Sequence, residues 1–213
     1  MDNNKIACIV LAAGQSRRMG ANNKLHLPVD GVPLLRRTVK TLQDSELGEM
    51  IVVLGYQSQS THTLLDGLAV RTAYNEAYLS GQMTSVHCGL SALKKSCAGV
   101  MIALGDQPAL SVAEINYLIK AYHKRNNAEV IVPTFQGARG NPIVISQQCR
   151  SDIVSGKRNL GCRKFIENNP DLVEMVEMPG PGVIIDLDTP LEYDNYCSSR
   201  QAEDADIIMQ QAN

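Results

Sequence analysis

The stretch from Ile6 to Pro28, IACIVLAAGQSRRMGANNKLHLP, decides the fold, because an apolar run passes directly into a loop that contains glycine and several cations. The run from Ile6 to Leu11 is typical of a strand that is buried on both faces. Residues 12–14, Ala-Ala-Gly, add little side-chain bulk, so a ligand can approach the backbone, and the N–H groups that follow can point at an anion. The stretch therefore predicts a nucleotide site.

The spacing of the loop differs from the two best-known phosphate loops. A Walker A loop has four residues between its glycines and a Lys directly after the second, whereas Gly14 and Gly20 enclose five and Lys24 comes four residues later. The dinucleotide fingerprint Gly-x-Gly-x-x-Gly is broken at Gln15 and Ser16. Two or three cations in the loop could clamp a triphosphate. The alternative is an ordinary strand-to-helix turn with solvated basic residues.

The composition favours a small-molecule ligand. The chain has 20 Lys and Arg against 22 Asp and Glu, no Trp and two Phe, and it lacks a basic block, so we expect no nucleic-acid partner. Its six cysteines form no C-x-x-C pair and its four histidines have no metal-ligand spacing, which indicates reduced thiols and no zinc site. Because no apolar run approaches the ~20 residues of a membrane span and no signal peptide is evident, we expect a soluble, cytoplasmic protein.

Strand-like runs alternate with helical patterns along the first two thirds of the chain. We expect strands at 50–54, 69–73, 100–104 and 130–133, and helices at 32–42, 57–65, 84–93 and 112–122. This alternation predicts an α/β fold with a doubly wound, mostly parallel, Rossmann-like sheet.

The last third of the chain alternates less regularly. A turn-rich segment at 135–142 predicts a small β-hairpin or irregular insertion before a strand at 143–145. A helix near Cys162 to Asn168 and a strand around Leu172 to Met178 follow. We expect a single domain over residues 1–198 and a polar tail over 199–213 that frays.

In a doubly wound sheet the ligand lies at the carboxyl ends of the strands, and Asp106 emerges there from a buried strand as a lone carboxylate. A hard divalent cation that bridges phosphate oxygens needs one or two carboxylates at such a place. The alternative is that Asp106 caps the helix that begins near Val112, although Ser111 is a nearer N-cap.

Asp186 and Asp188 form a second acidic point. If residues 184–188 are extended, both carboxylates share one face and could complete a metal site with Asp106, while Leu187 points into the core. The alternative is that Asp188, with Thr189 and Pro190, caps the helix that follows.

The segment Asn75-Glu-Ala-Tyr-Leu-Ser-Gly-Gln-Met-Thr-Ser-Val leads from the third expected strand into a helix. Gly81, Thr84 and Ser85 could read a base edge or receive a phosphate at the helix N-terminus. The alternative is that the hydroxyl groups are plain N-caps.

Five motifs, in this order, resemble the molybdenum cofactor cytidylyltransferases and the related molybdenum hydroxylase accessory proteins of the nucleotidyltransferase superfamily. They are LAAGQSRRMG with NKL, LSGQMTSV, ALGDQPAL, RGNPIVIS and DLDTPLEY, and they span Ile6 to Tyr193. Ala12-Ala13 is similar to the cytidylyl members, whereas guanylyl relatives have Ala-Gly-Gly there. Asn141 departs from the pattern, because many relatives have His at that position.

The resemblance implies Mg²⁺-dependent transfer of CMP from CTP to molybdenum-carrying molybdopterin, with a molybdenum hydroxylase as a further candidate partner. By the same resemblance, Arg18, Lys24 and Asp106 are catalytic, and Asp106 holds the metal with Asp186 or Asp188. Residues that would bind the nucleotide are Leu11, Ala12, Ala13, Gly14, Ser16, Lys24, Gly81, Met83 and Ser85. Residues on the acceptor side would be Gln107, Asn141 and Pro142.

Two rival functions stay open at this point. One reductase of heterocyclic dyes is similar to this family in sequence, but no added flavin or nicotinamide motif is present here. A non-catalytic chaperone for the molybdenum cofactor could keep the acceptor pocket but would not need both Asp106 and Lys24. The presence of both favours catalysis.

Overall fold

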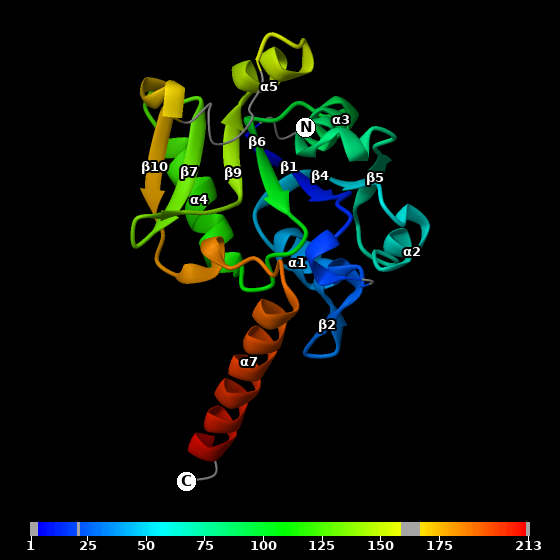
Figure 1. The fold of residues 1–213 in the computed structure, drawn as a ribbon. Coiled ribbons are helices and arrows are strands. Elements are labelled where there is room, and N and C mark those ends of the chain that lie inside the picture. Colours follow the sequence, from blue (N-terminus) through cyan, green and yellow to red (C-terminus); the bar gives the residue numbers. More distant parts are fainter. Residues whose placement is uncertain (1–3, 21, 159–166, 212–213) are drawn as a thin grey trace.

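The computed structural model describes residues 4–20, 22–158 and 167–211, which build one large mixed sheet (Figure 1). From edge to edge the strands are β10 (Val173–Glu177), β7 (Val130–Phe135), β9 (Ile143–Ser146), β6 (Gly99–Leu104), β1 (Ile6–Ala12), β4 (Leu47–Leu54) and β5 (Arg71–Tyr74), and β8 (Ala138–Arg139) pairs with β7. Strand β1 lies in the middle and is parallel to both β4 and β6. Among the described residues the antiparallel pairs of this sheet are β6 with β9, β7 with β9 and β7 with β8, and the other pairs are parallel. The expected mostly parallel α/β fold is confirmed.

Helices cover both faces of the sheet because the strands are apolar on both faces. On β1, Ile6, Cys8 and Val10 belong to one core layer, and Ala7 and Ile9 belong to the other. This two-residue period follows from the alternation of side chains along a strand. The first layer contains the buried faces of α1 (Leu34–Gln43) and α4 (Val112–Lys124), and the second those of α3 (Gln82–Ala92) and α5 (Gln147–Val154).

A small hairpin, β2 (Pro28–Val29) and β3 (Val32–Pro33), follows the first loop. Asp30 and Gly31 form its turn with φ angles of 50° and 76°, as an Asp-Gly hairpin turn requires. The helix expected at 32–42 therefore begins at Leu34, because the two residues before it pair as a strand. A short helix, α2 (Ser58–Thr63), lies where 57–65 was expected to be helical.

The C-terminal region differs from expectation in three places. Helix α5 was not predicted, and the helix expected near Cys162 to Asn168 lies largely outside the described residues. Residues 184–188 are not a strand, because Pro181–Ile184 is a 3₁₀ turn and the residues that follow are irregular. The expected frayed tail is instead helical as far as Gln211, in α7 (Pro190–Gln211), which extends away from the sheet (Figure 1).

The start of α7 packs on the hairpin that follows the first loop. Tyr193 and Tyr196 lie against a small buried cluster of Val29, Leu34 and Leu187. The Tyr193 hydroxyl also donates a hydrogen bond of 2.5 Å to the backbone oxygen of Pro28. This packing fixes the irregular segment before α7 close to the first loop.

Gly55→Ala should destabilise the protein by about 1–3 kcal/mol, the usual cost of an overpacked site. A Cβ atom at Gly55 would lie 2.7 Å from Tyr78 Cβ and 2.8 Å from Ala13 Cβ, so the end of β4 and the first loop would have to separate. Gly14→Ala is the matched control, because nothing lies within 4 Å of its added Cβ. In urea unfolding, Gly55→Ala should lower the midpoint concentration of urea and Gly14→Ala should not. Equal midpoints for the two variants would show that the contact at Gly55 is not tight.

Candidate active site

A hollow of about 440 Å³ lies at the carboxyl ends of β1 and β6, where a doubly wound sheet binds its ligands. Most of the residues expected in the site line it: Leu11, Ala12, Ala13, Gly14, Ser16, Arg18, Lys24, Ser85, Asp106, Asp186 and Asp188. Tyr78 and Gln82, which flank Gly81 in the LSGQMTSV region, also line it, although the sequence analysis gave them no role. Their position in a motif beside Ser85 was the available signal.

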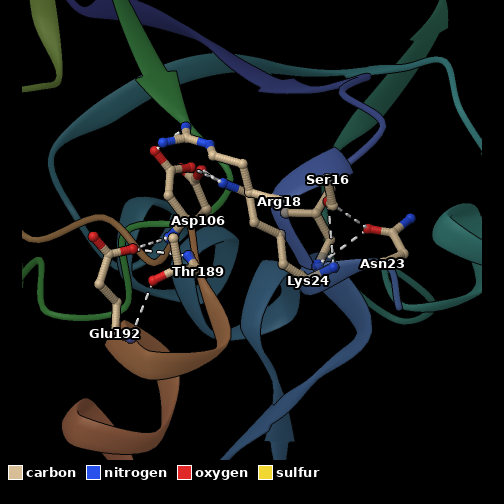
Figure 2. Close-up of polar contacts among 9 residues, drawn as sticks. Ser16, Arg18, Asn23, Lys24, Asp106, Thr189 and Glu192 are labelled. Carbon is tan, nitrogen blue, oxygen red and sulfur yellow. Dashed lines mark hydrogen bonds and ion pairs between the residues drawn. The ribbon is translucent and has the colours of Figure 1, made fainter. Parts of the chain in front are cut away.

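The first loop is held in place by a buried asparagine. The Asn23 side chain is 7% exposed, accepts hydrogen bonds from the Leu25 N–H (3.1 Å) and the Ser16 hydroxyl (3.4 Å), and donates to Gln57 Oε1 (3.1 Å). Ser16 Oγ accepts in turn from the Lys24 N–H at 3.3 Å (Figure 2). This network fixes the backbone of Lys24. The role of Asn23 depends on contacts across the loop, so no local sequence pattern indicates it.

Lys24 joins the loop to two distant carboxylates. Its ammonium group donates to Asp106 Oδ2 (Figure 2). It also donates to Asp188 Oδ1 at 2.6 Å. Asp188 Oδ2 accepts from Arg18 as well. These partners come from the loop after β1, the end of β6 and the segment before α7. Asp106, expected to be a lone carboxylate, is therefore paired, but its Oδ1 atom is buried and makes no hydrogen bond among the described residues.

Asp186 and Asp188 differ in their electrostatic surroundings. Burial raises the pKa of Asp186, and the neighbouring charges of Asp188 and Asp106 raise it further. Burial alone would raise the pKa of Asp188, but Lys24 and Arg18 outweigh it and hold that pKa below its usual value. Burial alone would lower the pKa of Lys24, but Asp106 and Asp188 outweigh it and raise that pKa. The site therefore favours the charged form of Lys24, and the Asp186 carboxylate is the group that a further positive charge would stabilise.

The capping alternatives are resolved by other side chains. Ser111 caps α4 in a capping box with Glu114, so Asp106 does not cap that helix. At the start of α7, Thr189 Oγ1 accepts from the Glu192 N–H at 3.3 Å, and the Glu192 carboxylate accepts from the N–H groups of Asp188 and Thr189 (Figure 2). Pro190 is the first residue of that helix, as expected, while the Asp188 carboxylate points to the cations.

The residues that line this hollow do not include five of those expected in the site: Gly81, Met83, Gln107, Asn141 and Pro142. Gly81 precedes α3, and Met83 lines a separate hollow of about 500 Å³ with Cys88. Ser85 does line the main hollow, and its hydroxyl accepts from Asn75 Nδ2 at 2.9 Å.

None of the three residues expected on the acceptor side lines the main hollow, and two of them, Gln107 and Asn141, meet at the Val183 carbonyl. Gln107 is 1% exposed and donates to Val183 O at 3.2 Å, and the Asn141 N–H donates to the same oxygen at 2.8 Å. Pro142 is buried and follows a cis peptide bond.

The residues of the hollow suit a hard divalent cation, although no group of three His, Cys, Asp or Glu side chains in the described ranges converges closely enough to hold a metal as it stands. Asp106, Asp186 and Asp188 offer the carboxylate oxygens that Mg²⁺ prefers. The unpartnered Oδ1 of Asp106 and the raised pKa of Asp186 both indicate room for another positive charge.

A comparison with protein families identifies the reaction class. The model of the MobA-like NTP transferase domain matches residues 8–173, more than three quarters of the chain. The chain belongs to the MobA-like NTP transferase family. It is therefore a member of the nucleotidyltransferase superfamily, and the expected family is confirmed.

Curated relatives of this MobA-like chain carry several different names. The purine catabolism protein PucB of Bacillus subtilis is 30% identical over 199 residues (87% of this chain, 93% of the relative). The molybdenum cofactor cytidylyltransferase of Escherichia coli is 27% identical over 189 residues (88% and 93%), and the nicotine blue oxidoreductase of Paenarthrobacter nicotinovorans is 26% identical over 186 residues (85% and 91%). A bifunctional GlmU protein of Geotalea uraniireducens is longer, and the match spans 30% of its length.

Solved structures of the same fold match nearly the whole MobA-like chain. A nucleotidyl transferase from Methanothermobacter thermautotroptrophicus has a TM-score of 0.78 at 23% identity, covering 92% of this chain and 97% of that one. A Mycobacterium tuberculosis protein in complex with manganese has a TM-score of 0.76 at 21% identity, covering 92% and 100%. Within the described part of the family domain and its C-terminal helix, no helix has the length and apolarity to cross a bilayer.

Asp106→Asn should lower nucleotidyl transfer by orders of magnitude, because it removes a negative charge but keeps size and hydrogen-bonding capacity. Asp44→Asn is the control, because Asp44 pairs with Lys40 on the exposed face of α1. Pyrophosphate release at saturating Mg²⁺ measures the effect. If Asp106→Asn kept more than about a tenth of the activity, a loss below ~1.4 kcal/mol, the carboxylate would not serve the reaction.

Arg18→Met should lower kcat/KM about 10- to 100-fold, since a charge-assisted contact is worth roughly 1.5–3 kcal/mol. Arg17→Met should have a smaller effect, because the Arg17 guanidinium, although Arg17 also lines the hollow, donates to Gln15 Oε1 at 2.9 and 2.7 Å and has no carboxylate partner among the described residues of the hollow. Steady-state kinetics of this adjacent pair test the assignment, and it fails if Arg17→Met is the more damaging change.

Proposed function

We propose that this chain transfers CMP from CTP to the terminal phosphate of molybdopterin carrying molybdenum, with Mg²⁺ as cofactor. The products are molybdopterin cytosine dinucleotide and pyrophosphate. The observation that carries the proposal is the meeting of Lys24, Arg18 and three carboxylates beside the Gly14 loop, in one hollow at the carboxyl ends of the strands. The likeness to the E. coli molybdenum cofactor cytidylyltransferase, along 88% of the chain, supports the choice of substrates.

The chain's own residues would act by positioning the reactants and neutralising charge. An acceptor phosphate oxygen attacks the α-phosphorus of CTP, a new P–O bond forms, and the bond to the β-phosphate oxygen breaks with release of pyrophosphate. Arg18 and Lys24 would bind the triphosphate and stabilise the negative charge that gathers on the leaving pyrophosphate. The Ser16–Asn23 contacts keep the Lys24 backbone in one place, so its side chain need only reorient.

Asp106, with Asp186 and Asp188, would hold the magnesium ion. When bound, Mg²⁺ supplies positive charge to the phosphate oxygens and helps to align them. The manganese complex of a structural neighbour is consistent with a divalent ion in this fold.

The proposed preference for CTP rests on the side of the hollow formed by Ala12 and Ala13. Ala13 is 4% exposed, and the space beside it is closed by Gly55 and Tyr78, as the 2.7–2.9 Å approaches of an added Gly55 Cβ indicate. The Ala13 methyl group takes room that glycine would leave, which favours the smaller pyrimidine ring. The Ser85 hydroxyl already accepts from Asn75, so its O–H would be left without an acceptor beside a wrong base edge.

The acceptor would lie on the side of Gln107, Asn141 and Pro142. Gln107 directly follows Asp106, and Gln107 and Asn141 both donate to the Val183 carbonyl. The Asp106 backbone oxygen accepts from the Leu187 N–H at 3.2 Å. Gln107 Oε1 is buried and makes no hydrogen bond among the described residues, so it could accept one from an acceptor molecule that reaches it.

Incubation with Mg²⁺, molybdenum cofactor and each nucleoside triphosphate in turn should give pyrophosphate release fastest with CTP. We expect dCTP to be used better than UTP, and Asp106→Asn to give no release above background. Mass spectrometry should identify molybdopterin cytosine dinucleotide as the second product. Equal turnover with GTP would contradict the proposed base specificity.

The same preparation tests the two rival functions. A flavin-dependent reductase would be yellow, with visible absorbance that follows the protein on a sizing column. A cofactor chaperone would bind molybdenum cofactor but release no pyrophosphate with any triphosphate. Either result would overturn the proposal of CMP transfer.

A further inference from the structure

The Lys24 ammonium occupies the position between the two carboxylates that a divalent cation would use. It contacts Asp106 Oδ2 and lies 2.6 Å from Asp188 Oδ1. The side chains of Lys24 and Asp106 are each 13% exposed, and that of Asp188 is 23% exposed. This contact is therefore a largely buried ion pair, in which neither partner is well solvated.

Both oxygens of Asp188 are already engaged by cationic side chains. Arg18 takes the other oxygen of Asp188, so Asp188 is shared between two cationic side chains. An ammonium group and a metal ion cannot both occupy the space between Asp106 and Asp188, because two like charges a few ångströms apart repel strongly in a poorly solvated site. Lys24 and a divalent ion bound by these carboxylates would exclude one another.

The loop allows the Lys24 side chain to change partner without moving its backbone. Ser16 and Asn23 hold the backbone near Lys24, while the side chain has a flexible four-carbon stem that ends in a point charge. Gly14, Ser16 and Lys24 line the same hollow as Asp106. A triphosphate in the hollow would thus offer the ammonium new anionic partners within reach.

We propose that Lys24 is a built-in counterion that is exchanged during binding: its ammonium leaves Asp106 and Asp188 for the triphosphate, and the carboxylates then accept the divalent cation. This inference rests on the metal assignment of the proposed function. The exchange makes metal binding weak when no nucleotide is bound. It also couples the metal to the nucleotide, and by linkage each must strengthen the binding of the other equally. The site would take up metal and nucleotide together.

Manganese binding without nucleotide tests this exchange, with electron paramagnetic resonance counting the free ion. Lys24→Met removes the competing charge and should bind one Mn²⁺ at least tenfold more tightly than the unaltered protein. Lys40→Met is the matched control, because it makes the same substitution at the exposed Lys40–Asp44 pair of α1, and it should leave the affinity unchanged. Adding Asp106→Asn to Lys24→Met should abolish the gain.

Circular dichroism checks that each variant is folded. If Lys24→Met does not fold, Lys24→Gln replaces it in the binding measurement, because glutamine keeps a hydrogen-bond donor beside the carboxylates. Equal Mn²⁺ affinity in the unaltered protein and both neutral variants would overturn the exchange, as would loss of binding in those variants. A gain that survives Asp106→Asn would also overturn it, because the ion would be bound elsewhere. CTP-dependent pyrophosphate release is measured separately, so failure of the exchange and failure of CMP transfer are distinguishable.

Discussion

The Lys24 ammonium, placed between Asp106 and Asp188, ties together three segments that are far apart in the sequence. One is the loop after the central strand, one is the end of the neighbouring strand β6, and one is the segment that enters α7. Each segment alone has an unpaired charge in a poorly solvated place, which is costly. Their meeting balances these charges and at the same time brings the groups of the site to one edge of the sheet.

The rest of the architecture supports this cluster. Strand β1 is buried on both faces and pairs with parallel neighbours on both sides, so the point where the loop begins is fixed by the core. Asn23 then sets the path of the loop through contacts with Ser16, Leu25 and Gln57. At the other end, the tyrosines of α7 pack against the hairpin and keep Asp188 near the cations. The proposed exchange of Lys24 for a metal ion would leave the packing of β1, the Asn23 contacts and the packing of the α7 tyrosines in place, because none of these uses the Lys24 ammonium.

The fold could be predicted from the sequence wherever local pattern and burial agree. The apolar runs of β1, β4 and β6 are long and continuous, so they indicate central parallel strands without ambiguity. Helix α5 was missed because its eight residues have a weak apolar periodicity, and only Cys149 and Ile153 are buried. The helical residues after 198 were missed because that segment is mostly polar in sequence and lacks the periodic apolar pattern on which helix prediction depends.

The sequence indicated which residues belong to the candidate site, but not which of them contact one another. Position after a strand identified Asp106, and the spacing of the loop identified Lys24, because both signals are local. Their contact joins residues 82 positions apart, and that of Lys24 with Asp188 joins residues 164 apart, so no local pattern could reveal either. For the same reason Asp106 was expected to be unpaired. Tyr78 and Gln82 line the hollow through the turn before α3, whose geometry depends on Gly81 at a φ of 107°.

A crystal structure with Mg²⁺ and a non-hydrolysable CTP analogue bound would show whether Lys24 changes partner. We expect the Lys24 ammonium to contact phosphate oxygens, and Asp106 to coordinate the metal with Asp186, Asp188 or both. If the nucleotide and metal bind while the ammonium remains between Asp106 and Asp188, Lys24 is not exchanged.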